Sequence, residues 1–134
     1  MAELYWGGKK VLGIKPPGED YIELRPQKVL KGFSYSIPEG TTSLAEEAFK
    51  NWHSLSSVTI PASVISIGSN CFLWCDLDSI YFEGDPPETF GSNWWTHSST
   101  GKIPTIYYKA DNHNWDALTG SDKLGGATVK WATY

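Results

Sequence analysis

An internal repeat constrains the fold of this chain more than any other feature of its sequence. Residues 35–55 and 58–77 carry the same apolar pattern at a spacing of 23 positions, so that Ile37-Pro38 corresponds to Ile60-Pro61. The other correspondences at this spacing are Leu44 with Ile67, Ala48 with Cys71, Phe49 with Phe72 and Trp52 with Cys75. Self-similarity at a period of about 20–50 residues predicts a repeat array in which each copy forms one coil.

A weaker third copy follows the first two. It occupies residues 77–84 and ends where the chain reads Asp85-Pro86-Pro87. Its correspondences are Leu77 with Leu55, Ile80 with Val58 and Phe82 with Ile60. We therefore expect a mainly β fold with short helical turns, built as a short solenoid of two clear coils and a modified third.

Each coil is expected to contain a strand, a stop and a turn. Residues 58–60 alternate apolar and polar side chains as a strand does, and Pro61 ends that strand where its missing N–H is not needed. We expect Gly68 to allow a tight turn and residues 69–75 to form a short helical turn that buries Phe72. One coil cannot bury its apolar side alone, so stacked coils must supply the core.

The second copy carries a family resemblance. Its sequence LSSVTIPASVISIGSNCFLWCDLDSI (residues 55–80) resembles the BspA-type leucine-rich repeat, L-x-x-I-x-I-P-x-S-V-x-x-I-G-x-x-A-F-x-x-C, and the resemblance covers residues 33–84. The matching positions are Ile60-Pro61, Ser63-Val64, Ile67-Gly68, Phe72 and Cys75. The chain departs from the pattern at Cys71, where Ala is usual, at Trp52, where Cys is usual, and at SLAEEAF (43–49), where Ile-Gly is expected. These departures are expected to alter the packing and to leave the fold unchanged.

The resemblance implies a leucine-rich-repeat solenoid with a binding or adhesion role and no catalysis. It points to proteins of host-associated bacteria, their phages and some protists. It divides the chain into residues 33–84, which hold the repeats, a segment before them and a segment after them.

The first segment, residues 1–32, is predicted to be a β arm that serves attachment or oligomerisation. The sequences ELYWGG and KKVLGI are typical of two short strands joined by a turn at Gly7-Gly8. The candidate assembly residues are Tyr5, Trp6, Val11 and Ile14. Residues 24–36 are also similar to a short motif of phage tail and fibre proteins, matched at Pro26, Val29, Leu30, Lys31, Gly32 and Phe33.

The last segment, residues 85–134, resembles the irregular unit that closes BspA-type arrays. We expect it to cap the solenoid and to serve recognition. One strand is expected at residues 105–108. A further strand is expected at residues 127–134, with Val129, Trp131 and Thr133 on one face.

Composition excludes several classes of protein. The chain has 134 residues, which suits one domain, and its 40% hydrophobic residues are too many for a disordered chain. A net charge of −4 does not suit a nucleic-acid binder. We see no apolar run long enough for a signal peptide or a membrane-spanning helix, and therefore expect no membrane insertion.

Catalytic and metal-binding patterns are weak. His53, His97 and His113 have no zinc-ligand spacing, and we expect no metal and no cofactor. Cys71 and Cys75 are interpreted as buried thiols, with catalysis by either one as the minor alternative. The carboxylate pairs, such as Glu46-Glu47, Asp76 with Asp78 and Glu83 with Asp85, are interpreted as solvated faces.

Aromatic residues concentrate in the last third of the chain, where Tyr107 accompanies the candidate ligand-binding residues. These candidates are Trp94, Trp95, His97, Tyr108, His113 and Trp115. Such rings stack on sugars or anchor protein interfaces, and the alternative is that they fill the core of a small terminal unit. Consecutive Trp94 and Trp95 cannot both point inward from an extended chain, so we expect at least one of them to be half exposed.

These observations favour a non-enzymatic structural and recognition protein. The first hypothesis is a phage virion component of the tail, baseplate or capsid appendage, assembled in the host cytoplasm. It predicts a homo-oligomer of cyclic symmetry, for which a trimer fits, or contact with other virion proteins. The second hypothesis is a bacterial adhesin, at the cell surface or secreted, that binds a host protein or glycan. An enzyme such as a glycan hydrolase would need a cleft that a short solenoid does not offer.

Overall fold

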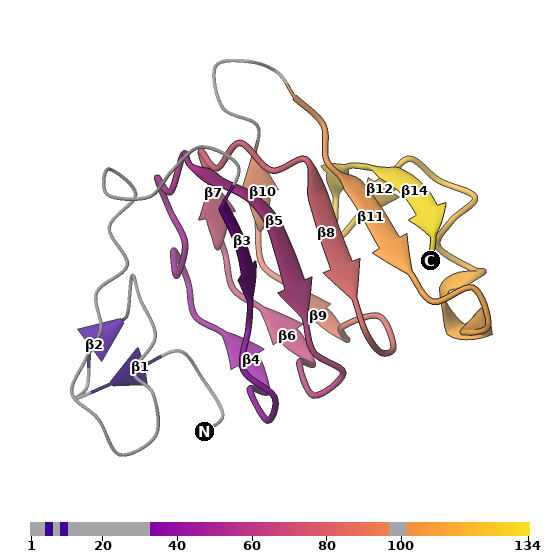
Figure 1. The fold of residues 1–134 in the computed structure, drawn as a ribbon, viewed down its shortest axis with the longest axis horizontal. Helices are drawn as coiled ribbons and strands as arrows, with labels where there is room; N and C mark the ends of the chain where they lie inside the picture. Colours follow the sequence, from indigo (N-terminus) through magenta and orange to yellow (C-terminus); the bar gives the residue numbers. More distant parts are fainter. Residues whose placement is uncertain (1–4, 7–8, 11–32, 97–101) are drawn as a thin grey trace.

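The computed structural model describes residues 33–96 and 102–134, together with the backbone of two short strands near the N-terminus. Five parallel strands, one from each successive coil, form its main sheet (Figure 1). They are β3 (Phe33–Ser36), β5 (Leu55–Ile60), β8 (Ser79–Phe82), β11 (Thr105–Tyr108) and β14 (Lys130–Thr133). Their register places Tyr35, Val58, Ile80, Ile106 and Trp131 in one row across the sheet.

Two smaller parallel sheets complete the coils. One side of the solenoid carries a three-stranded sheet of β4 (Ser43–Leu44), β6 (Ser66–Ile67) and β9 (Thr89–Phe90). Another side consists of turns and a two-stranded sheet of β7 (Phe72–Leu73) and β10 (Trp95–Thr96). The apolar side chains of all three sides meet inside the coils, where stacking buries them.

This architecture confirms the predicted fold class, a mainly β repeat solenoid. The correspondence between the second and third copies is also confirmed, because Val58 pairs with Ile80 and Ile60 pairs with Phe82. The main sheet does not stop at residue 84, however. Strands β11 and β14 continue it in the same parallel direction, so coils extend through the segment that was predicted to be a cap.

The predicted helical turn at residues 69–75 is wrong. Among the described residues, only the 3₁₀ helix η2 (His113–Trp115) is helical. The chain instead makes successive tight turns around β7, in which Cys71 N–H donates to Gly68 O and Cys75 N–H to Phe72 O. Asn70 (φ 56°) and Trp74 (φ 61°) adopt left-handed conformations that a right-handed helix cannot contain. The matching residues of the first coil, Glu47 and Asn51, are left-handed too.

Gly68 begins the tight turn of residues 68–71, as expected, and its lack of a side chain also serves close packing between coils. A Cβ atom placed on it would lie 2.5 Å from the backbone nitrogen of Glu46 in the preceding coil. Gly91 repeats this arrangement one coil later, where a Cβ atom would overlap the backbone nitrogen of Ser69. Glycine is therefore required at this position because the backbone of the neighbouring coil occupies the space of a side chain.

The core contains the thiols as predicted. Cys71 and Cys75 are both buried, and neither forms a disulfide within the described residues. The Cys75 thiol donates a hydrogen bond to the carbonyl oxygen of Phe49 over 2.9 Å. Burial raises the pKa of Cys75 to about 12, so this thiol stays protonated and unreactive at neutral pH.

Two antiparallel hairpins lie outside the parallel sheets. Strands β1 (Tyr5–Trp6) and β2 (Lys9–Lys10) pair as the sequence predicted, with Trp6 opposite Lys9. Strands β12 (Lys123–Leu124) and β13 (Ala127–Thr128) pair near the C-terminus. No helix in the described part of the chain is long and apolar enough to cross a membrane.

Candidate functional site

The outward face of the main sheet is the candidate functional surface. Side chains alternate along each strand, so those next to buried residues point away from the core. Ile80 and Phe82 are buried in β8, and Tyr81 between them points outward. Ile106 is buried in β11, and Tyr107 after it points outward on the neighbouring strand. The alternation thus places two partly exposed tyrosines side by side.

Three tyrosines form one packed group on this face. Tyr81 and Tyr107 occupy paired positions in β8 and β11, and their rings stack with centroids 4.6 Å apart and 13° between planes. The ring of Tyr134 stands nearly perpendicular to that of Tyr81, at 5.3 Å. We call these three residues the tyrosine wall. Such ring contacts are worth about 0.5–1.5 kcal/mol beyond area burial, so they hold the wall in place without a ligand.

Tyr134 is fixed at three points. Its N–H donates to the carbonyl oxygen of Tyr108 over 3.0 Å, and its hydroxyl donates to the carbonyl oxygen of Phe82 over 3.3 Å. The Nζ atom of Lys109 lies 4.5 Å from its ring centroid, within the range of a cation–π contact. Burial is the largest cause that raises the pKa of Tyr134, which keeps its hydroxyl a donor at neutral pH.

Small hydroxyl residues lie beside the tyrosine wall. On the outward side, β3 presents Ser34 and Ser36 and β5 presents Ser57 and Thr59. We call these four residues the hydroxyl floor. Ser34 pairs with Ser57, Ser36 pairs with Thr59, and Thr59 pairs with Tyr81, so floor and wall are continuous.

The prediction that Trp94 or Trp95 is half exposed is wrong, because their exposed fractions are 0% and 4%. Trp94 packs inside the coil against Phe72, and its Nε1 donates to the carbonyl oxygen of Leu124 over 2.6 Å. Trp95 points the other way and lines a cavity with the β12–β13 hairpin, including residues 125–128. A hairpin distant in sequence therefore covers the face that alternation would leave to solvent.

Trp115 and Tyr108 belong to the interior of the last coils. Trp115 is fully buried, and its Nε1 donates to the carbonyl oxygen of Gly84 over 3.0 Å. Tyr108 stacks on Trp115 at 5.8 Å and contacts Trp131 edge-on at 6.1 Å. Trp94 and Trp115 are consequently core residues, and Trp95 is buried except where it lines the cavity beside the hairpin.

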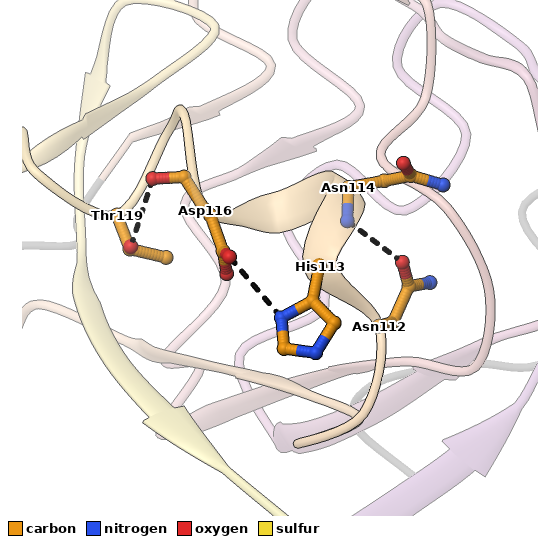
Figure 2. A network of polar contacts seen from close by, with 5 residues as sticks. All are labelled: Asn112, His113, Asn114, Asp116 and Thr119. Atoms are coloured by element: carbon orange, nitrogen blue, oxygen red, sulfur yellow. Dashed lines mark hydrogen bonds and ion pairs between the residues drawn. The ribbon is translucent and has the colours of Figure 1, made fainter.

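His113 is the exposed member of the predicted set, and His97 lies outside the described residues. His113 Nδ1 lies 3.2 Å from a carboxylate oxygen of Asp116. Asn114 N–H donates to the side chain of Asn112, and Figure 2 shows both contacts. Asn112 and Asn114 also donate to the carboxylate of Asp85, and these two bonds lower the pKa of Asp85. The network ties helix η2 to the loop after β8, which is a structural role.

Other predicted sites are not brought together. Within residues 33–96 and 102–134, no group of three or more His, Cys, Asp or Glu side chains is arranged to hold a metal. Tyr5 and Trp6 lie in β1, but their side chains, like Val11 and Ile14, fall outside the described part of the chain. The assembly role of these four residues stays a prediction.

Sequence reasoning missed Tyr81 and Tyr134 as surface residues and left Tyr107 out of the candidate set. The signal was present for the first of them. Ile80 and Phe82 were expected to be inward, and strand alternation then requires Tyr81 to point outward. Tyr134 had no such signal, because its ring position depends on contacts with two earlier coils.

The chain matches the family described as BspA type leucine rich repeat region, in six copies over residues 31–128. The matched region begins just before β3 and includes both residues of the stacked tyrosine pair. It also extends well past residue 84, in agreement with the additional strands of the main sheet. No curated protein and no solved structure matches the chain.

Proposed function

Because the chain belongs to the BspA-type leucine-rich repeat family, we propose that it is a non-enzymatic binding module whose binding surface is the outward face of the main sheet. Repeats of this family are generally binding modules. The observation that carries the proposal is the tyrosine wall, where Tyr81 and Tyr107 stack in register on the surface instead of in the core.

Aromatic rings on an outward face favour recognition over stability. Core positions already take the apolar residues of β8 and β11, and polar residues would serve equally well on the solvent side. Tyrosine combines a large apolar face with a polar tip, which is why it is enriched at binding surfaces. The rings are also held rigid by each other, so binding does not have to order them.

Our proposal places this module in a phage virion, in the tail, the baseplate or a capsid appendage. Residues 1–32 attach it or bring copies together, and the solenoid faces the host surface. The similarity of residues 24–36 to a phage tail and fibre motif supports this placement. A bacterial surface adhesin is the competing placement, and it uses the same sheet face.

Binding to an array of immobilised surface proteins and glycans tests the function. Wild-type chain should bind at least one printed probe, and the Tyr81→Ala/Tyr107→Ala double variant should lose that signal. Ile65→Ala is the matched control, because Ile65 is 51% exposed and lies outside the main sheet. Circular dichroism checks that all three proteins fold. Equal binding by the double variant and the wild type would show that another surface binds.

A further inference from the structure

We propose that the ligand of this face is a neutral glycan, with the C–H face of one pyranose ring stacked on Tyr81 and its hydroxyls bonded to the hydroxyl floor. This inference rests on the proposed function and names its ligand class. It follows from the shape of the wall, the chemistry of the floor, which consists of Ser and Thr alone, and the negative charge of Glu83 that acts on the wall.

Tyr81 has one ring face in contact with Tyr107 and the other turned toward the floor. Tyr107 lies on the β11 side of Tyr81, where the rings stack at 4.6 Å. Tyr134 is 5.3 Å from Tyr81 but 6.5 Å from Tyr107, which places it at the edge of the pair and not over a face. On the opposite side, the residue paired with Tyr81 is Thr59. Because the ring of Tyr81 stands higher above the sheet than the side chain of Thr59, the two residues form a step. The side of this step is the free face of the Tyr81 ring.

The floor supplies hydroxyls that can turn toward a ligand. Within the described part of the chain, the hydroxyls of Ser34, Ser36, Ser57 and Thr59 make no hydrogen bond to another protein group. Each one can donate and accept. Sugar hydroxyls have the same dual character, so a row of serine and threonine matches a row of sugar hydroxyls.

Charge at the step favours a neutral sugar. The floor consists of Ser and Thr alone. The charge that acts on the tyrosine wall is negative, because Glu83 adds to burial in raising the pKa of Tyr134. Lys109 is engaged with the ring of Tyr134 and is not part of the floor. A carboxylated or sulfated glycan would lose hydration at the step, find no cation in the floor and be repelled by Glu83.

The dimensions suit a short stretch of a sugar chain. Neighbouring strands are about 4.8 Å apart, so the distance from β3 to β8 across two strand spacings is roughly 10 Å. An elongated ligand can thus lie across the strands, with one ring against Tyr81 and the next over the floor. Protein interfaces, in contrast, centre their aromatic anchors in pockets that neighbouring residues close to water.

Titration of the full-length chain with defined probes tests the inference. The probes are neutral hexasaccharides of β-1,4-glucose, α-1,4-glucose, β-1,4-galactose and α-1,6-mannose, an oligogalacturonate of equal length, and a proline-rich decapeptide. Amide chemical shifts and isothermal calorimetry report binding. At least one neutral hexasaccharide should bind saturably and more tightly than the oligogalacturonate or the decapeptide.

Four variants separate the contacts. Tyr81→Ala should weaken binding at least tenfold, and Tyr81→Phe should retain it, because stacking needs the ring and not its hydroxyl. Thr59→Val keeps the side-chain shape and removes one hydroxyl, so it should weaken binding several-fold. Ile65→Ala should bind as wild type does. Far-UV circular dichroism and thermal unfolding confirm that each variant folds.

The other outcomes overturn the inference in distinguishable ways. Preferred binding of the decapeptide or of a printed protein, lost in Tyr81→Ala, would refute the glycan and leave the binding face in place. Preferred binding of the oligogalacturonate would refute the neutral ligand. Neutral glycan binding that Tyr81→Ala leaves unchanged would refute both the step and the proposed surface. If no probe binds, the glycan inference is refuted.

Discussion

The rings of Phe49 and Phe72 lie almost parallel inside the solenoid, with centroids 5.1 Å apart and 6° between their planes. They occupy the same position in two consecutive coils. Phe49 N–H also donates to the carbonyl oxygen of Cys71 over 2.8 Å, so ring stacking and backbone pairing join the coils at one point. Residues at the same position of the sequence repeat thus contact each other between consecutive coils.

Phe72→Ala should destabilise the protein by about 3–5 kcal/mol, the usual cost of removing a fully buried phenylalanine. The loss leaves a cavity between Phe49 and Trp94, which both contact the ring. Leu73→Ala is the control, since Leu73 lies beside Phe72 in β7 but is only partly buried. Urea unfolding followed by tryptophan fluorescence measures both. Equal losses for the two variants would contradict the role given to Phe72.

Gly68→Ala should destabilise the protein by about 1–3 kcal/mol, because the added Cβ would overlap the backbone of the preceding coil. That backbone cannot move freely, since Gly68 N–H is bonded to the carbonyl oxygen of Leu44 over 2.8 Å. Gly120→Ala adds the same atom where no other atom lies within 4 Å and should be close to neutral. Thermal unfolding compares them, and similar melting temperatures would show that coil spacing is not rigid.

Burial of Cys75 should make stability fall at alkaline pH. The pKa of its thiol rises from 9.0 to about 12 on folding, so between these values the unfolded chain releases a proton that the folded chain keeps. The contribution of this thiol to the free energy of unfolding is therefore fully present below pH 9. It falls by about 1.4 kcal/mol per pH unit between pH 9 and pH 12. Tyr35, whose pKa rises from 10.0 to about 12 on burial, adds to the loss above pH 10.

The free energy of unfolding, measured from pH 8 to 11 for the wild type and for Cys75→Ser, isolates the contribution of the Cys75 thiol. Serine keeps a donor for the carbonyl oxygen of Phe49 and does not titrate in this range. The variant should lose less stability with rising pH, and parallel curves would assign the effect to other groups. In the folded protein at neutral pH, a thiol reagent should modify Cys71 and Cys75 only as fast as the chain opens.

The parts of the fold that repeat in sequence could be predicted, and the parts that depend on distant segments could not. Val64, Ile67 and Phe72 are buried as the repeat register required. The later coils were missed because more residues separate their strands in the sequence. Ile80 pairs with Ile106, and Ile106 pairs with Trp131. Insertions between strands hide the period without changing the register within the sheet.

The turns were mispredicted for a conformational reason. Trp74 is left-handed and 47% exposed, and tryptophan gives no sequence signal for that conformation. The candidate site was only partly predictable. An aromatic recognition surface was expected in the last third of the chain, but Trp94, Trp95 and Trp115 fill the core. The surface rings are Tyr81, one coil earlier, together with Tyr107 and Tyr134.

The assembly hypothesis makes a prediction about mass in solution. Within the described residues, β3 and β14 each pair on one side only, and such strand edges favour association. If residues 1–32 join copies of the chain, light scattering should give an oligomer for the full-length protein, with a trimer as the expected size. A chain of residues 33–134 should give a folded monomer, because it retains all five strands of the main sheet.

A point variant at the sheet edge distinguishes assembly through that edge from assembly through residues 1–32. Strand β14 is an edge strand whose Lys130 and Tyr134 N–H groups donate to β11, so alternation turns the N–H of Thr133 toward the open edge, and Thr133→Pro would block pairing there. An oligomer that survives loss of residues 1–32 but dissociates in Thr133→Pro would assign assembly to the sheet edge. Monomers in every case would leave a detachable binding module, and the trimer prediction would then be wrong. Circular dichroism of each protein ensures that masses are compared between folded chains.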